Sequence, residues 1–106
     1  MFIDYPTFEK ELQIVKTKVP NIDNWLAQEI CAFMGELRTM RLEKVPGVAE
    51  TLDWATSLAE MHFDHLDKEV VESTLGVVLK DWDDMRTTQD SLSELFDKVK
   101  VKLKVE

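Results

Sequence analysis

The sequence predicts an all-α domain, a small bundle of four to five helices. Apolar residues recur at helical spacing along most of the chain, and a period-two pattern typical of a strand occurs at the C-terminal end alone. Three glycines and three prolines in 106 residues leave room for uninterrupted helices. A chain of this length supports one modest hydrophobic core, so the helices are expected to pack around it as one small unit.

The first two helices are predicted from prolines, caps and apolar stripes. The first starts near Pro6, because a first-turn proline loses no hydrogen bond, and ends at Val19, because the residue before Pro20 is pushed out of the α region. Residues 21–24 supply several N-caps for a longer second helix, whose one-face apolar stripe needs a packing partner. The stripe consists of Leu26, Ile30, Phe33, Leu37 and Met40.

Two further helices are predicted in the middle of the chain. The third has Glu50 and Asp53 near its positive N-terminal end. Its apolar stripe consists of Val48, Leu52, Ala55, Leu58 and Met61. The fourth begins at Asp67, a good N-cap, and continues towards Trp82. Gly76 lies inside it, and we expect this glycine at a helix-packing contact rather than at a break.

The C-terminal tail, residues 87–106, has an ambiguous pattern, whereas residues 1–86 form one predicted helical domain. Four apolar residues at helical spacing indicate a short helix that begins at Asp90 or Ser91. They are Leu92, Leu95, Phe96 and Val99. Residues 99–105, however, alternate between apolar and basic. This last segment is therefore disordered, helical by context, or a strand that pairs with another chain.

The composition narrows the classes of partner. A formal net charge of -8 argues against nucleic acid and against an anionic membrane, because binding phosphates requires clustered Lys and Arg. The sequence has no apolar stretch long enough to span a bilayer and no signal peptide, which predicts a cytoplasmic protein. The single cysteine, Cys31, has no histidine or basic cluster near it in sequence, so we expect a small apolar core residue rather than a nucleophile.

Two polar clusters have the residue types of metal sites, and we expect neither to hold a metal. His62, Asp64, His65 and Asp67 stand at a predicted helix-to-helix turn. Zinc accepts such ligands, but their spacing is not diagnostic of a metal site, and we interpret the segment as an ordinary loop. Residues 81–84 (DWDD) lack the glycine and the bidentate glutamate of an EF-hand loop. We interpret this acidic segment as a solvated helical face.

The three tryptophans are expected in the core or at an interface, because Trp25, Trp54 and Trp82 each lie on or beside an apolar stripe. Trp54 follows Leu52 by two residues, which turns it away from the centre of the stripe of the third helix. Two interpretations of Trp54 therefore stay open: a plain core residue, or a contact with a neighbouring domain.

Three segments carry a family resemblance: residues 45–55 (VPGVAETLDWA), 66–67 (LD) and 73–80 (STLGVVLK). They resemble the small C-terminal helical lid of MoxR-type AAA+ ATPases, in particular the branch associated with carbon monoxide dehydrogenase maturation. Residues 2–6 (FIDYP) look like the segment through which such proteins leave the nucleotide-binding core. The resemblance covers residues 2–84 and implies an AAA+ lid-like helical fold.

In this family the lid covers the nucleotide, contacts the next subunit of a hexameric ring and moves during ATP turnover. Many members carry an arginine, the sensor-two residue, at the start of the third lid helix, where Val48, Ala49 and Glu50 stand here. None of these side chains supplies the cation that stabilises a transferred phosphate. The residues that the resemblance places near the nucleotide are small enough to approach adenine or ribose. They are Pro46, Gly47, Val48 and Ala49.

The chain contains no G-x-x-x-x-G-K-[ST] motif, so we expect it to have no ATPase activity of its own. The resemblance implies a lid fragment that contributes to a nucleotide cleft and to ring assembly, while ATP and Mg bind to the parent ATPase. It implies as partners the ATPase core, sister subunits and a von Willebrand factor A-type protein. A free-standing helical protein-interaction adaptor is the alternative, and a small metal-binding regulator built on His62 and His65 is a third hypothesis.

Overall fold

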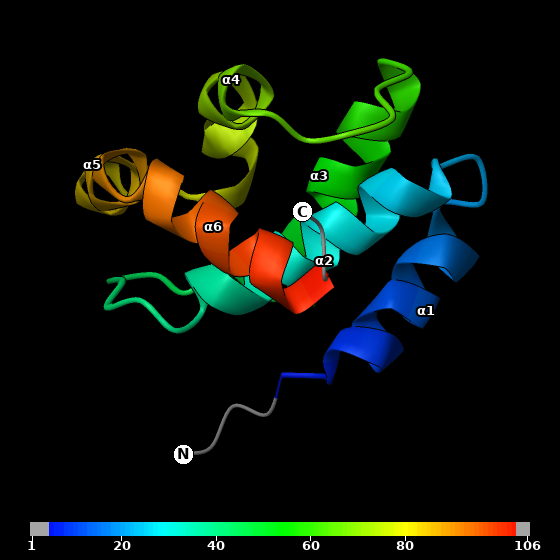
Figure 1. Ribbon diagram of the computed structural model, residues 1–106, viewed down its shortest axis with the longest axis horizontal. Helices are drawn as coiled ribbons and strands as arrows, with labels where there is room; N and C mark the ends of the chain where they lie inside the picture. Colours follow the sequence, from blue (N-terminus) through cyan, green and yellow to red (C-terminus); the bar gives the residue numbers. More distant parts are fainter. Residues whose placement is uncertain (1–4, 104–106) are drawn as a thin grey trace.

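The computed structural model describes residues 5–103, which form six α-helices and no strand (Figure 1). The helices are α1 (Phe8–Lys18), α2 (Asn24–Leu37), α3 (Val48–Glu60), α4 (Lys68–Val78), α5 (Trp82–Asp90) and α6 (Leu92–Leu103). The predicted all-α class is therefore confirmed. The described residues contain more helices than the four to five predicted, because α4 ends earlier than expected and two helices follow it.

Side-chain caps set the starts of several helices. Thr7, and not Pro6, stands before the first turn of α1, where its hydroxyl accepts from a backbone N–H at 3.3 Å. Asp23 caps α2, which places the cap within the predicted segment, and its carboxylate accepts from a backbone N–H at 3.0 Å. Asp67 caps α4 and Val19 ends α1, both as predicted.

Helix α2 is the centre of the fold and contacts α1, α3 and α6 (Figure 1). Four members of its predicted stripe are buried, whereas Met40 lies beyond the end of α2 and is half-buried. Four further side chains of this helix are buried as well. They are Ala27, Cys31, Ala32 and Met34. A helix that is apolar on several faces must be covered on several sides, which is why the other helices pack around it.

Trp54 connects α3 to α4 and α2 in the core. Its side chain has no exposed surface, and its ring meets Phe33 edge-on with 5.5 Å between the ring centroids. The indole Nε1 donates to Thr74 Oγ1 at 2.8 Å, and that hydroxyl donates to Val70 O at 2.7 Å. Both donors are therefore paired inside the core. Of the two interpretations of Trp54, the core residue is confirmed.

The chain breaks between α4 and α5, so the predicted continuation of the fourth helix to Trp82 is wrong. Leu79 has an extended backbone and a buried side chain. Asp81 then accepts from the backbone N–H groups two and three residues further on, at 2.9 and 3.2 Å. Because its side chain takes up these N–H groups, Asp81 begins a new helix instead of lying inside a longer one.

The C-terminal segment forms α6, so the strand and disorder interpretations are wrong for residues 99–103; residues 104–105 lie outside the described part of the chain. Helix α6 packs on α2. Its buried residues are Leu92, Leu95 and Val99. Their spacing matches one face of a helix, and burial against α2 overrides the period-two pattern. Val101 lies off this face and is 78% exposed.

Gly76 lies inside α4 but is exposed, so the predicted helix-packing contact is wrong. A Cβ built on Gly76 would have Met85 Cε as its nearest neighbour, at 4.0 Å. We predict that Gly76→Ala raises the free energy of unfolding by about 1 kcal/mol, because the methyl group fits and alanine restricts the unfolded chain. Thermal unfolding followed by circular dichroism should show a melting temperature higher by roughly 4–8 °C.

The same substitution at Gly47 is the matched control. Gly47 is the N-cap of α3, a position at which alanine is less favourable than glycine. Gly47→Ala should therefore leave the melting temperature unchanged or lower it. If Gly76→Ala instead lowered the melting temperature, this result would contradict the position of Gly76 in the middle of α4 on its solvent-exposed side.

Candidate functional site

The four residues that the resemblance places near a nucleotide form the entry into α3. Pro46 is buried, Gly47 and Val48 are half-buried, and Ala49 is exposed. Gly47 is the N-cap, and its N–H donates to Glu50 Oε2 at 3.3 Å. Of these residues, the structure thus places Gly47, Val48 and Ala49 at least partly at the surface, where the α2–α3 connection becomes a helix.

Arg38, at the end of α2, fixes the position of this entry. Its Nε donates to Pro46 O at 2.9 Å. Its Nη1 and Nη2 donate to the two carboxylate oxygens of Glu11, each at 2.8 Å. This bidentate pair is buried, with 7% of the Arg38 side chain and 2% of the Glu11 side chain exposed. The planar guanidinium therefore ties α1 to the start of α3.

Thr51 of α3 completes a buried Glu11–Arg38–Thr51 cluster. Its hydroxyl donates to Glu11 Oε2 at 2.7 Å and accepts from Arg38 Nη2 at 3.1 Å. The ring of Tyr5 covers the guanidinium, with 4.6 Å between Arg38 Cζ and the ring centroid. The two opposite charges neutralise each other and are hydrogen-bonded, which makes their burial tolerable.

This cluster was not predicted from the sequence, although one signal was present. Glu11 lies on the apolar face of α1, three residues after Phe8 and four before Val15. A carboxylate on an apolar face requires a partner when that face is buried. The partner, Arg38, is 27 residues away, beyond the range of any local pattern.

The charges at the entry into α3 favour a neutral group over a phosphate. Arg38 directs Nε, Nη1 and Nη2 at protein acceptors, so its charge is committed to the cluster. Glu50 places a carboxylate oxygen 3.3 Å from Gly47 N. A phosphate at this position would be repelled by that carboxylate. An adenine ring or a ribose would instead meet small side chains.

Asp84 of α5 holds the α2–α3 connection that leads to Pro46. It is buried, its Oδ1 accepts from Glu43 N at 2.8 Å, and its Oδ2 accepts from Lys44 N at 2.9 Å. The predicted solvated acidic face is therefore wrong for Asp84, because two loop N–H groups require this acceptor. Asp81 caps α5.

The loop between α3 and α4 brings together Asp64, His65 and Asp67. His65 Nδ1 lies 2.6 Å from Asp64 Oδ1, and His65 Nε2 lies 3.6 Å from Asp67 Oδ2. The hydrogen bond with Asp64 raises the pKa of His65, and the same bond lowers the pKa of Asp64. His62 has a left-handed backbone, with φ of 61°. Within residues 5–103, no group of three or more His, Cys, Asp or Glu side chains is placed to hold a metal ion.

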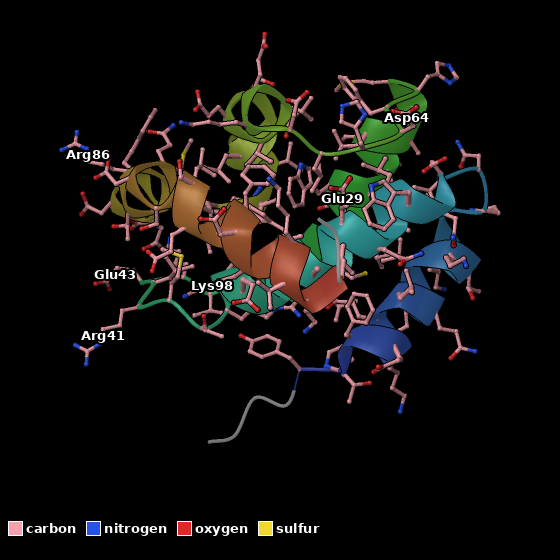
Figure 2. The ribbon with its side chains drawn as sticks, viewed as in Figure 1. Glu29, Arg41, Glu43, Asp64, Arg86 and Lys98 are labelled. Atoms are coloured by element: carbon pink, nitrogen blue, oxygen red, sulfur yellow. The ribbon has the colours of Figure 1, made fainter. Side chains whose placement is uncertain are left out.

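Glu29 of α2 holds the other end of this loop, and it lies on the same side of the molecule as Asp64 (Figure 2). Its Oε1 accepts from Leu66 N at 2.8 Å. Burial raises the pKa of Glu29, and the hydrogen bond from Leu66 opposes this rise. A partly buried carboxylate thus satisfies a loop N–H at some desolvation cost.

Cys31 lies in the interior of α2 and is buried. Burial raises the pKa of its thiol to about 12, and the Glu11 carboxylate acts in the same direction. The thiol is therefore protonated at neutral pH, and the predicted role as a small apolar core residue is confirmed.

A scan against protein-family models, a search of curated proteins and a search of solved structures each found no match for this chain. The resemblance to MoxR-type lids therefore stays a prediction, as does the division of the chain after residue 86. Residues 2–4 of the FIDYP segment lie outside the described residues. Between residues 5 and 103, no helix has both the length and the apolar character needed to cross a bilayer.

We predict that Arg38→Ala lowers the free energy of unfolding by about 3–5 kcal/mol, because it leaves the Glu11 carboxylate buried without a partner. Glu11→Ala should have a similar effect, since it leaves the Arg38 guanidinium buried without its carboxylate partner. The double variant should lose less than the sum of the two single losses, because no unpaired charge then remains. Urea unfolding followed by circular dichroism measures all three, and Arg38→Lys serves as a milder variant. Additive losses would contradict the pairing.

We predict that Glu29→Gln stabilises the protein near neutral pH. The amide oxygen still accepts from Leu66 N, while the burial of a charge is avoided. The folded-state pKa of Glu29 lies above its ordinary value of 4.5, so the ionised side chain destabilises the fold at neutral pH. This destabilisation disappears as the pH falls below the ordinary value.

Urea unfolding of the wild type and of Glu29→Gln from about pH 7 to about pH 4 measures this effect. The advantage of the variant should shrink as the pH falls. An advantage that stays constant over this range would show that the burial of the Glu29 charge is not its cause.

Proposed function

We propose that this chain is the helical lid of a MoxR-type AAA+ ATPase, acting in the cytoplasm over the nucleotide of a separate P-loop core, without catalysis of its own. The supporting observation is the anchored segment 46–49. It belongs to the resembling sequence, Arg38 fixes its backbone through Pro46 O, and Ala49 is exposed. An anchored segment of small residues that ends at an exposed alanine suits close contact with a flat ligand.

The proposed lid contacts adenine or ribose and leaves the phosphates to the core. Val48, Ala49 and Glu50 stand where many members of the family carry the sensor-two arginine. The Glu50 carboxylate disfavours phosphate at this place. Stabilisation of the charge that develops during hydrolysis then falls to the core and its Mg. The proposed partners are the ATPase core, sister subunits of a ring and a von Willebrand factor A-type protein.

A free-standing helical adaptor is the second candidate, and two exposed tryptophans favour it. Trp82 is 84% exposed and Trp25 is 36% exposed, and tryptophan is enriched among the residues that dominate interface energy. A lid can use such a surface too. The two candidates differ at the entry into α3, where the lid alone requires a nucleotide contact.

Titration of the isotope-labelled chain with ATP, followed by amide NMR shifts, tests the lid function. We predict that the amide signals of Gly47, Val48 and Ala49 shift, with a dissociation constant of about 1 mM, because the phosphate contacts belong to the core. Adenosine should cause the same shifts, since base and ribose make the contacts. Ala49→Gln should weaken binding about tenfold, because the longer side chain blocks close approach.

Thr56→Gln is the matched control, since Thr56 is exposed on α3 seven residues after Ala49. This variant should bind ATP as the wild type does. If ATP and adenosine leave the signals of residues 47–49 unchanged well above the predicted dissociation constant, the adaptor becomes the preferred function.

A further inference from the structure

The outer face of α6 combines an exposed apolar residue with charges of both signs. Five residues of this face line an open recess of about 380 Å³, which Glu36 of α2 completes. The five are Glu94, Asp97, Lys98, Val101 and Lys102. Their spacing places them on one side of the helix. Val101 is 78% exposed, whereas the residues of α6 that face α2 are buried.

We propose that this α6 face binds a second copy of the chain, with the two α6 helices packed antiparallel about a two-fold axis. Val101 of each copy then enters the recess of the other, which removes two exposed apolar side chains from water. Lys98 projects from this helix (Figure 2). The helical structure of α6 replaces the strand pairing that the sequence pattern allowed.

The order of charges along α6 identifies the partner as a second copy. The acidic Glu94 and Asp97 come before the basic Lys98 and Lys102. In an antiparallel pair, Asp97 therefore meets the partner's Lys98. The two-fold axis makes this pair occur twice. Lys102 is already engaged within its own chain, because its Nζ lies 5.2 Å from the centroid of the Phe8 ring of α1. A parallel pair would place like charges together and is disfavoured.

The local charge permits this contact although the chain as a whole is acidic. The net charge of -8 repels a second copy in general. The recess, however, is lined by three acidic and two basic residues, so its charge is nearly balanced. Helix α6 has 12 residues. Such a helix is about 18 Å long, which gives a small interface and a weak dimer with a dissociation constant of roughly 100 μM.

The α6 face is distinct from the entry into α3, so the dimer does not rest on the proposed function. A two-fold contact also closes after two copies, whereas a ring contact continues to further subunits. Sedimentation equilibrium of the purified chain over a range of concentrations measures the dimer directly. The wild type should fit a monomer–dimer equilibrium, and Val101→Glu should weaken the dimer at least about tenfold.

A charge swap separates specific pairing from general repulsion. Asp97→Lys and Lys98→Glu should each weaken the dimer, because each places like charges opposite each other. The double variant should restore it to within about threefold of the wild type, since the pairs form again with reversed signs. Lys100→Glu is the matched control for Lys98→Glu: it changes the net charge equally but does not line the recess.

Circular dichroism of each variant shows whether the helices are retained. A wild-type chain that stays monomeric at about 1 mM would overturn the proposal. The proposal would also be overturned if the dimer of the double variant were no tighter than the dimers of the single variants. A Lys100→Glu dimer as weak as the Lys98→Glu dimer would overturn it too. Continued growth beyond a dimer would overturn the two-fold arrangement.

Discussion

The buried Glu11–Arg38–Thr51 cluster is the interaction on which the arrangement of the first three helices depends. One guanidinium binds both oxygens of Glu11, the Thr51 hydroxyl and Pro46 O, so three helices and a loop share one set of donors. Such a cluster tolerates little displacement, because each lost contact leaves a buried charge or polar group unpaired. The position of the α3 entry follows from it.

Two other carboxylates work in the same way at other edges of the core. Glu29 accepts from Leu66 N in the α3–α4 loop, and Asp84 accepts from two backbone N–H groups in the α2–α3 connection. Part of the acidic composition therefore does more than solvate a surface. These carboxylates accept hydrogen bonds from loop N–H groups that lie outside the hydrogen-bonding pattern of the helices. They thereby fix the loops between the helices.

The exposed features of the molecule lie on different elements, which lets them act independently. The entry into α3 presents small side chains beside a carboxylate, α5 presents Trp82, and the outer face of α6 presents Val101 among balanced charges. The first suits a neutral part of a small ligand and the other two suit proteins. A lid and an adaptor both need protein-binding surfaces, whereas the lid alone needs the ligand.

The sequence by itself determined the all-α class, an N-cap for α2 within residues 21–24, the cap at Asp67 and the burial of Cys31, because helical periodicity and capping act over a few neighbouring residues. The placement of residues 46–49 near a nucleotide stays a prediction that rests on the family resemblance. Only the tertiary structure decided the helical state of residues 99–103 and the burial of Asp84. The partners of these residues are distant: Glu43 N and Asp84 are 41 positions apart. A contact of that separation leaves no periodic trace in the chain, and packing against α2 overrode the local alternation in α6.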